Sequence, residues 1–380
     1  MAVTFAQKLA RLPHYEAGMH EDAAREAFGS QDVIKLASNE SPWPPHPAVI
    51  EAIAGAAKGL NRYPDQHARR LRRRIAERFD TDPARVAVGN GSCEILLAAA
   101  EALCEAGDEI LFAWPAFSIY PHLAALSGAR EIRVPLATGY VHDLEAMLAE
   151  VTAATQLVCV CNPNNPTGTH LPAERIAEFC ARVPSHVTVA LDEAYVEFQT
   201  NDDPDATVDL LGDFPNLVVL RTFSKVHGLA GLRCGYALCS ARFRGAVDAV
   251  RQPFSVNELA QTAAAEAILH GDDVVERVER TIVERVFVEE ALRELGLEPP
   301  DSQANFSWVP LGDLDEAQVI RSLGEQGIVV RGGEGLGGPG HIRVTYGTRA
   351  ENERFLGALA TVMGGRNLRN PSARGTNSGQ

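Results

Sequence analysis

Between residues 85 and 240 the chain alternates short apolar runs with longer stretches that have helical spacing. The short runs are apolar at consecutive positions, which is typical of strands with both faces buried. Such strands lie between two layers of helices in a mostly parallel sheet. We therefore predict an α/β domain with strands at RVAVGN (85–90), EILFAWP (109–115), LVCVCN (157–162), VTVALDE (187–193), LVVLRTFSK (217–225) and RCGYALC (233–239).

A long Glu- and Arg-rich stretch at about 272–296 predicts a helix that leads into a second region. There, strand-like runs at 305–311, 327–333 and 341–347 accompany a helix-like stretch at 314–327, which indicates a smaller α+β domain. The early segment VIKLASNESPWPPHP (33–47) begins as a strand and its prolines exclude a helix, so it joins the smaller domain or bridges the two. We expect an N-terminal arm at 1–30, a large domain at 45–268, a small domain from 31–44 and 269–364, and a disordered tail at 365–380.

The composition is that of a soluble globular protein of 380 residues, 46% of them hydrophobic. The formal net charge of −15 argues against a nucleic-acid partner, because phosphate binding depends on basic patches. In the basic cluster HARRLRRRIAERF (67–79) an apolar residue recurs every fourth position, so we interpret its arginines as the solvated side of an amphipathic helix. We find no signal peptide and no run of the roughly 20 apolar residues that cross a bilayer, so we expect a cytoplasmic protein without a membrane partner.

Two features that could indicate other chemistry have simpler explanations. The seven cysteines lie mostly in apolar stretches, without a CxxC pair or a His/Cys cluster at metal-ligand spacing, so we expect reduced core thiols and no metal. The stretch GEGLGG (333–338) fits the GxGxxG pattern, but it leads through Pro339 into another strand-like run instead of a helix. We interpret it as a loop.

Polar residues cluster where the strands of the large domain are predicted to end, at 89–92, 162–167, 192–195 and 222–225. Open α/β sheets bind their ligands at the carboxyl ends of the strands. The candidate site therefore lies at this edge of the sheet.

Lysine is rare in this chain, which has only Lys8, Lys35, Lys58 and Lys225, and the last of these follows a buried run. Asp192 also ends a buried run, where an unpaired carboxylate is costly and needs a cationic partner. An arginine pair for the aspartate and a salt bridge for the lysine are the structural alternatives. A partly desolvated amine, however, is also a neutral nucleophile that forms Schiff bases.

These two residues together suggest pyridoxal phosphate (PLP) as the cofactor. Its aldehyde condenses with a lysine such as Lys225, and its ring nitrogen works best when it is protonated beside an aspartate such as Asp192. Asn165 and Tyr195 can donate to its phenolate oxygen. Its phosphate suits the N–H groups of the glycine-rich GNGS (89–92) before a helix, the hydroxyl of Ser224 and the forked cation of Arg233.

The motifs CNPNNPTGT (161–169), LDEAYVEF (191–198) and TFSKVHGLAGLRCGY (222–236) closely resemble those of the class I and II aminotransferases of fold type I. Together with RYPD (62–65) and HIRVTYGT (341–348), they look most like the histidinol-phosphate aminotransferase branch. The resemblance runs from about Tyr15 to Gly364. It implies a mostly parallel seven-stranded sheet between helices in the large domain, a smaller α+β domain, and a homodimer with shared active sites.

The resemblance also implies roles for single residues around the cofactor. Lys225 matches the Schiff-base lysine and proton shuttle, Asp192 the partner of the ring nitrogen, and Tyr195 and Asn165 the donors to the phenolate oxygen. Phe117 in WPAFSIY resembles the aromatic residue that stacks on the ring. The phosphate cup is matched by Gly91, Ser92, Thr222, Ser224 and Arg233, and Tyr63 in RYPD matches a residue that reaches the phosphate of the neighbouring subunit.

On the substrate side, Arg343 resembles the arginine that grips a substrate carboxylate, which for this branch is that of glutamate. Asn39, Arg331 and Tyr15 match further substrate positions. The activity implied is transamination between histidinol phosphate and 2-oxoglutarate in histidine biosynthesis, with both anionic substrates held by the two arginines.

Of two departures from the family pattern, the first touches a backbone contact to the phosphate and the second leaves the side-chain specificity open. Cys93 stands where an acidic residue is common, and VRGGEGLGG (330–338) replaces a common VRP. Transamination of aromatic amino acids is the nearest alternative, followed by decarboxylation of a phosphorylated amino acid. A PLP-binding regulator would need a DNA-binding module, and the roughly 30 residues before VIKLASNE are too few for one.

Overall fold

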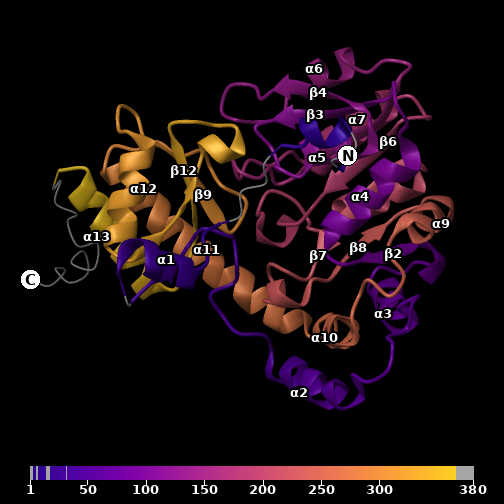
Figure 1. Cartoon of the computed structure of the whole chain (residues 1–380), viewed down its shortest axis with the longest axis horizontal. Coiled ribbons are helices and arrows are strands. Elements are labelled where there is room, and N and C mark those ends of the chain that lie inside the picture. The colour runs from indigo at the N-terminus through magenta and orange to yellow at the C-terminus, as the bar shows by residue number, and fades with distance from the viewer. Residues whose placement is uncertain (1–2, 6, 14–17, 31, 365–380) are drawn as a thin grey trace, which may run out of the picture.

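The computed structural model describes residues 3–5, 7–13, 18–30 and 32–364 (Figure 1). Its larger part is built on a seven-stranded sheet in the order β2-β8-β7-β6-β5-β3-β4. The strands are β2 (Val86–Gly89), β3 (Glu109–Trp114), β4 (Arg130–Pro135), β5 (Thr155–Cys161), β6 (Thr188–Asp192), β7 (Leu217–Thr222) and β8 (Gly235–Leu238). Only β8 pairs antiparallel, with β2 and β7, so the predicted mostly parallel seven-stranded sheet is confirmed.

Both faces of this sheet are buried, because successive side chains of a strand point to opposite faces. Leu111 and Ala113 of β3 join one apolar core, whereas Ile110 and Phe112 join the other. The first core is closed by α2 (Pro47–Ala56), α3 (Arg69–Arg78), α6 (Leu144–Ala149), α7 (Ala173–Arg182) and α10 (Glu258–Ala267). The second is closed by α4 (Ser92–Leu103), α5 (Tyr120–Ser127) and α9 (Ala241–Val250).

The smaller part contains a three-stranded antiparallel sheet in the order β11-β12-β9, and a separate parallel pair of β1 and β10. Because β1 pairs with β10, the segment 33–47 begins in the smaller part. Figure 1 shows α11 running from this part towards α10. The elements are α1 (Glu21–Phe28), β1 (Ile34–Lys35), α11 (Gly271–Glu294), β9 (Phe306–Pro310), α12 (Glu316–Glu325), β10 (Ile328–Val329), β11 (Arg331–Gly332), β12 (His341–Thr345) and α13 (Arg349–Val362).

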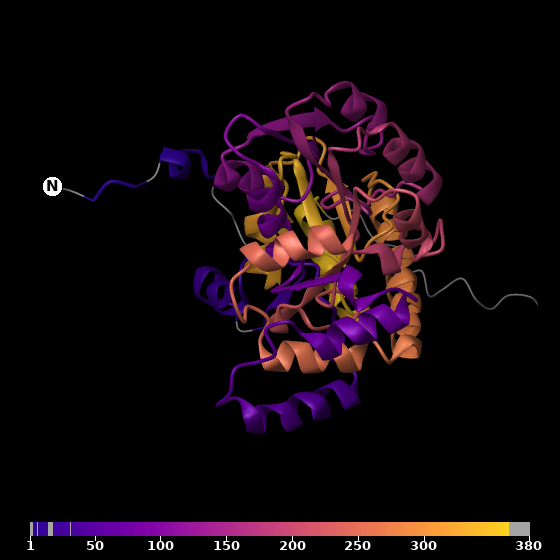
Figure 2. The ribbon, with the colours of Figure 1, turned by 90° about the vertical axis from the view of Figure 1, so that its right-hand side faces the viewer.

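We propose domain boundaries at 44/45 and 268/269. One set of core residues in the large part begins at Val49 and extends to Ala267, whereas Leu36 packs into a separate core with residues from Val288 to Ala360. Figure 2 shows α2 at one edge of the molecule, and its closest partner is α10. The N-terminal arm contains α1 and the short turn η1 (Gln7–Arg11), and the tail predicted at 365–380 lies outside the described residues.

The predictions for three segments are confirmed. The charged stretch forms α11, the stretch 314–327 contains α12, and GEGLGG contains only the short turn η7 (Glu334–Leu336). All seven cysteines are free, and all but Cys93 are buried. No helix within the described ranges is long and apolar enough to cross a membrane. The remaining short elements are η2 (Ala57–Gly59), η3 (Pro83–Arg85), η4 (Val196–Phe198), α8 (Ala206–Asp209), η5 (Leu210–Gly212) and η6 (Ala230–Leu232).

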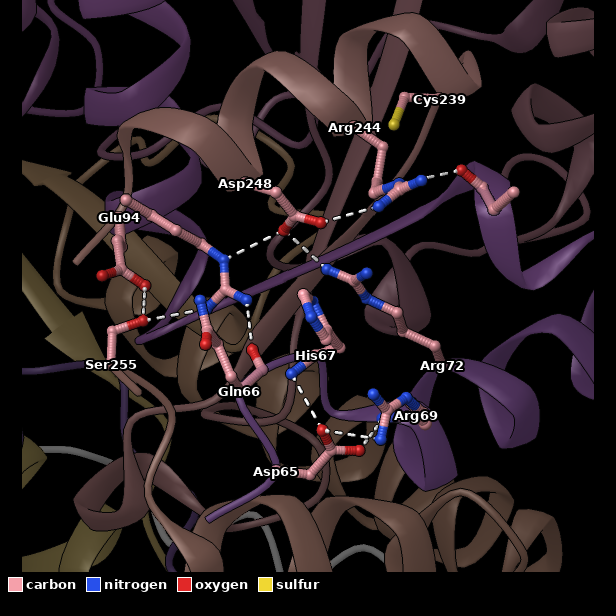
Figure 3. Close-up of polar contacts among 12 residues, drawn as sticks. Asp65, Gln66, His67, Arg69, Arg72, Glu94, Cys239, Arg244, Asp248 and Ser255 are labelled. Carbon is pink, nitrogen blue, oxygen red and sulfur yellow. Dashed lines mark hydrogen bonds and ion pairs between the residues drawn. The ribbon is translucent and has the colours of Figure 1, made fainter. Parts of the chain in front are cut away.

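The interpretation of the basic cluster is wrong for one of its arginines. Arg72 is buried in α3 and donates to Oδ1 of Asp248 on α9 at 2.6 Å (Figure 3). Arg244 donates to Oδ2 of the same carboxylate at 2.8 Å, and Arg251 donates to its Oδ1 at 3.0 Å and to the carbonyl of Gln66 at 2.6 Å. Helical periodicity places an arginine on a helix face, but it cannot show that another helix brings an acid to that face.

We expect Asp248→Asn to destabilise the fold, because it leaves these arginines without their shared anion. Burial raises the pKa of Asp248, but hydrogen bonds from Arg72 and Arg244 outweigh it and lower the pKa from 3.8 to about 2. The carboxylate therefore contributes about 2 kcal/mol above pH 4, and this contribution is lost as the pH falls towards 2.

Urea unfolding should show this loss at pH 7 and roughly half of it near pH 3. The exposed Asp313 provides a control, and Asp313→Asn should unfold like the parent protein at both pH values. An Asp248→Asn effect that is independent of pH would contradict the ion-pair explanation.

Candidate active site

The carboxyl ends of β5, β6 and β7 open into a cavity of about 340 Å³ between the large sheet and the smaller part. Most of the predicted site residues line it together, although they come from segments far apart in the sequence. These are Asn39, Ser92, Phe117, Asn165, Asp192, Tyr195, Thr222, Ser224, Lys225, Arg233, Arg331 and Arg343.

Lys225 lies just beyond the end of β7, in a turn that is partly buried. Its Nζ donates to the carbonyl of Ser38 at 3.2 Å and lies 5.5 Å from the ring centre of Tyr195. Burial lowers the pKa of this amine from 10.5 to about 8, and the positive charge of Arg343 adds to the shift. A substantial fraction of the amine is therefore neutral, and nucleophilic, at moderately alkaline pH.

Asp192 is the last residue of β6, the strand next to β7, and its side chain is buried. Its Oδ2 accepts a hydrogen bond from the hydroxyl of Tyr120 at 3.1 Å, whereas its Oδ1 has no hydrogen-bond partner among the described residues. Burial raises the pKa of this carboxyl from 3.8 to about 6. The alternative of an arginine pair is absent from the described ion pairs, and the neutral Tyr120 bonds the carboxylate instead.

An anion site lies where α4 begins. Gly91 precedes the helix with φ at +75°, and a Cβ there would lie 2.5 Å from Nη2 of Arg233, so only glycine lets the guanidinium approach. Arg233 also donates to the hydroxyl of Ser224 at 3.4 Å, and the hydroxyl of Thr222 donates to the same oxygen at 2.9 Å. The N-terminus of α4, which begins at Ser92, completes an arrangement that suits a phosphate.

A second group of residues links the cavity to the smaller part. Nη1 of Arg343 donates to Oδ1 of Asn165 at 2.5 Å, and its Nη2 donates to the carbonyl of Ala37 at 2.8 Å. The hydroxyl of Tyr195 accepts from Nδ2 of Asn39 at 3.0 Å. Burial raises the pKa of Tyr195 well above its ordinary value, so its hydroxyl stays protonated.

Arg331 and Arg343 are direct partners across the antiparallel pair of β11 and β12. Residues opposite each other in such a pair project from the same face of the sheet. Both arginines are buried and both line the cavity that contains Lys225. Two fixed guanidinium groups on one wall suit a substrate with two anionic groups, or two substrates that differ in the position of an anion.

These residues fit the groups of PLP. The buried Oδ1 of Asp192, without a donor, matches a protonated ring nitrogen, and the anion site at α4 matches a phosphate. Lys225 would supply the amine that holds the aldehyde carbon. The aromatic ring of Phe117 lies in the same cavity.

Two predicted residues are not among those placed at this site, Tyr63 having been expected to reach the neighbouring subunit, and two residues at the site were missed. Tyr63 is 83% exposed and does not line the cavity, and Tyr15 lies outside the described residues. Tyr120 and Leu336 were not predicted, although one bonds Asp192 and the other lines the cavity. Neither carries a sequence signal, because a tyrosine at a helix start and a leucine in a glycine-rich loop are both ordinary.

Comparison with known proteins indicates the same cofactor as the geometry of the cavity. The family model described as "Aminotransferase class I and II" matches residues 31–359. A histidinol-phosphate aminotransferase of Geobacillus thermodenitrificans is 40% identical, over 94% of this chain and 97% of its own. An aromatic amino acid aminotransferase of Cutibacterium acnes is 41% identical, over 93% of this chain and 97% of its own.

A solved structure leads to the same family. The histidinol-phosphate aminotransferase of Sinorhizobium meliloti in complex with pyridoxal-5'-phosphate superposes with a TM-score of 0.86. It is 29% identical in sequence, and the match covers 96% of this chain and 98% of that one. With a family model over most of its length and relatives near 40% identity, the chain belongs to the class I and II aminotransferases and is a PLP-dependent enzyme.

Proposed function

We propose that this aminotransferase exchanges the amino group between histidinol phosphate and 2-oxoglutarate. The observation that supports this most directly is the pair of buried arginines, Arg331 and Arg343, which line one cavity with Lys225. Glutamate carries two carboxylates, and histidinol phosphate carries a distal phosphate but no carboxylate. Both substrates therefore bring an anion to a point far from the reacting amino group.

In this proposal each of the two arginines binds a different anionic group of the substrates. Arg343 would hold the α-carboxylate of glutamate, because its contacts with Asn165 and Ala37 fix the plane of its fork. Arg331 would meet the distal carboxylate or the phosphate. The same wall would thus accept both substrates in turn.

The cofactor supplies an electron sink that stabilises negative charge at the Cα of the substrate. Lys225 would take the proton from Cα with its Nζ and return one in the reverse half-reaction. An amine with a pKa near 8 suits both steps, because it is neither permanently charged nor too weak a base.

The other polar side chains would hold protons in place. The buried carboxylate of Asp192 would keep a proton on the ring nitrogen, since its Oδ1 needs a donor. Tyr195 accepts from Asn39, so its own hydroxyl hydrogen remains for the phenolate oxygen. Asn165 accepts from Arg343 through Oδ1, so its amide nitrogen is left to donate.

Transamination of aromatic amino acids is the second candidate. Its support is the set of relatives with that name, which are 40–43% identical to this chain. An aromatic substrate brings no distal anion into the cavity. The two guanidinium groups that line one wall therefore favour the substrate with a distal anion.

We expect histidinol phosphate to have a higher kcat/KM than phenylalanine or tyrosine. Arg331→Ala should lower kcat/KM for histidinol phosphate roughly 10- to 100-fold, because a charged hydrogen bond is lost. It should change kcat/KM for phenylalanine little. Arg321→Ala on the exposed face of α12 is the matched control and should leave both values unchanged. If phenylalanine is preferred tenfold or more in the parent enzyme, the second candidate replaces the first.

We also expect Lys225 to react as an amine with a pKa near 8 in the cofactor-free protein. The neutral fraction grows as the pH rises through the pKa, so acetylation of Lys225 should reach half of its maximal rate near pH 8. Competitive labelling with peptide mass spectrometry measures this, with an added lysine peptide as standard, which titrates near about 10.4. Parallel curves for Lys225 and the standard would contradict the proposed role of burial.

We propose further that the enzyme is a homodimer in which Tyr63 reaches the cofactor phosphate of the partner subunit. Tyr63 is 83% exposed and stacks on Phe254 at 4.8 Å between ring centres. Its segment is held firmly, because the carbonyl of Gln66 bonds Arg251 and the carboxylate of Asp65 caps the start of α3 (Figure 3). This exposed aromatic pair is therefore available to contact a partner subunit.

The dimer predicts complementation between two defective chains. Tyr63→Phe keeps the ring but removes the hydroxyl, and should weaken cofactor binding about tenfold, as expected for a hydrogen bond to a charged group. Lys225→Ala removes activity. A mixed dimer contains one site with both native residues, so mixing the two variants at limiting cofactor should give more activity than Tyr63→Phe alone. If the activities of the two variants simply add in the mixture, Tyr63 does not act across an interface. An active monomer in sedimentation would show the same.

A further inference from the structure

The loop 333–340 joins β11 to β12 and is fixed near both ends by one carboxylate. Glu316, the first residue of α12, accepts from the backbone N–H of Glu334 at 3.0 Å and of Gly340 at 2.8 Å. Within the loop, the N–H of Leu336 donates to the carbonyl of Gly333 at 2.9 Å. The segment is therefore a defined turn, although a glycine-rich sequence in isolation is flexible.

This loop also packs on the large domain. Gly337 has φ at +87°, and a Cβ there would lie 2.3 Å from Nε1 of Trp114, the last residue of β3. Just after the loop, Nε2 of His341 lies 3.0 Å from the hydroxyl of Tyr140, which belongs to the large domain. Glycine is needed at 337 both for its backbone conformation and for this close approach. The loop thus closes the cavity from the small-domain side while resting on the large domain.

The packing directs one side chain into the cavity. Leu336 is 4% exposed and lines the same cavity as Lys225, Phe117 and Arg331. Among the described lining residues it is the one branched aliphatic side chain, and the others are polar, aromatic, or as small as alanine and cysteine. A leucine held by a fixed backbone presents a definite apolar surface to whatever the cavity binds.

We propose that Leu336 is a specificity-determining residue, which forms the apolar wall against which the ring of the amino donor packs. The inference rests on the proposed function in that the donor carries an imidazole ring on one branch of its amino-bearing carbon and the phosphate on the other. Arg331 would bind the anion and Leu336 would contact the ring. Glutamate has no ring and so depends on the arginines instead.

The test compares the two half-reactions of Leu336→Ala under single-turnover conditions. The kcat/KM for histidinol phosphate should fall at least about tenfold, mainly because KM rises. A change of this size is typical of lost apolar contact in a substrate pocket. The half-reaction with glutamate should change less than about threefold, since a folded active site remains. Leu269→Ala removes the same atoms from a leucine that is 50% exposed, and should change neither half-reaction.

The outcomes separate this inference from the proposed substrate. If the enzyme prefers phenylalanine but Leu336→Ala still lowers its kcat/KM tenfold relative to glutamate, the substrate proposal fails and the role of Leu336 stands. If both half-reactions fall equally, Leu336 only supports the fold and the inference is overturned. It is also overturned if neither half-reaction changes.

Discussion

The site depends on keeping a carboxylate and an amine at the ends of two neighbouring parallel strands without letting them neutralise each other. Asp192 ends β6 and Lys225 follows β7, and no ion pair joins them among the described contacts. Burial moves the pKa of the acid up to about 6 and that of the amine down to about 8. Asp192 therefore still lacks a hydrogen-bond donor for one of its oxygens. The amine of Lys225 stays available to react with an electrophilic carbon.

Hydrogen bonds with neighbouring groups hold the carboxylate of Asp192 and the amine of Lys225 apart. The hydroxyl of Tyr120 occupies one oxygen of Asp192, and the carbonyl of Ser38 holds Nζ of Lys225. Both partners are neutral, so they fix geometry without cancelling charge. The large sheet, buried on both faces by helices, supplies the rigid frame for these contacts.

The residues proposed to select the substrate lie where the smaller part meets the large sheet. Arg343 on β12 donates hydrogen bonds to Asn165, which follows β5, and to the carbonyl of Ala37. These bonds link the wall that carries the two arginines to the site proposed for the cofactor. Leu336 lies on the same boundary, because its loop is fixed to α12 on one side and packs on Trp114 on the other. In our proposal the chemistry is built on the sheet and the selectivity on the loops that meet it.

The sequence by itself determined the architecture and the cofactor side of the site. Short continuous apolar runs favour strands covered on both faces, and parallel strands bring their carboxyl ends to one edge, so Asp192, Asn165 and Lys225 were expected to meet. Only the tertiary structure decided which groups touch across elements, as with Arg72 and Asp248 or Tyr120 and Asp192. Periodicity describes one element at a time, whereas a buried polar contact depends on the packing of two. The same reason explains Leu336, whose position in the cavity follows from a loop fixed by α12 and by β3 rather than from its own neighbours in the chain.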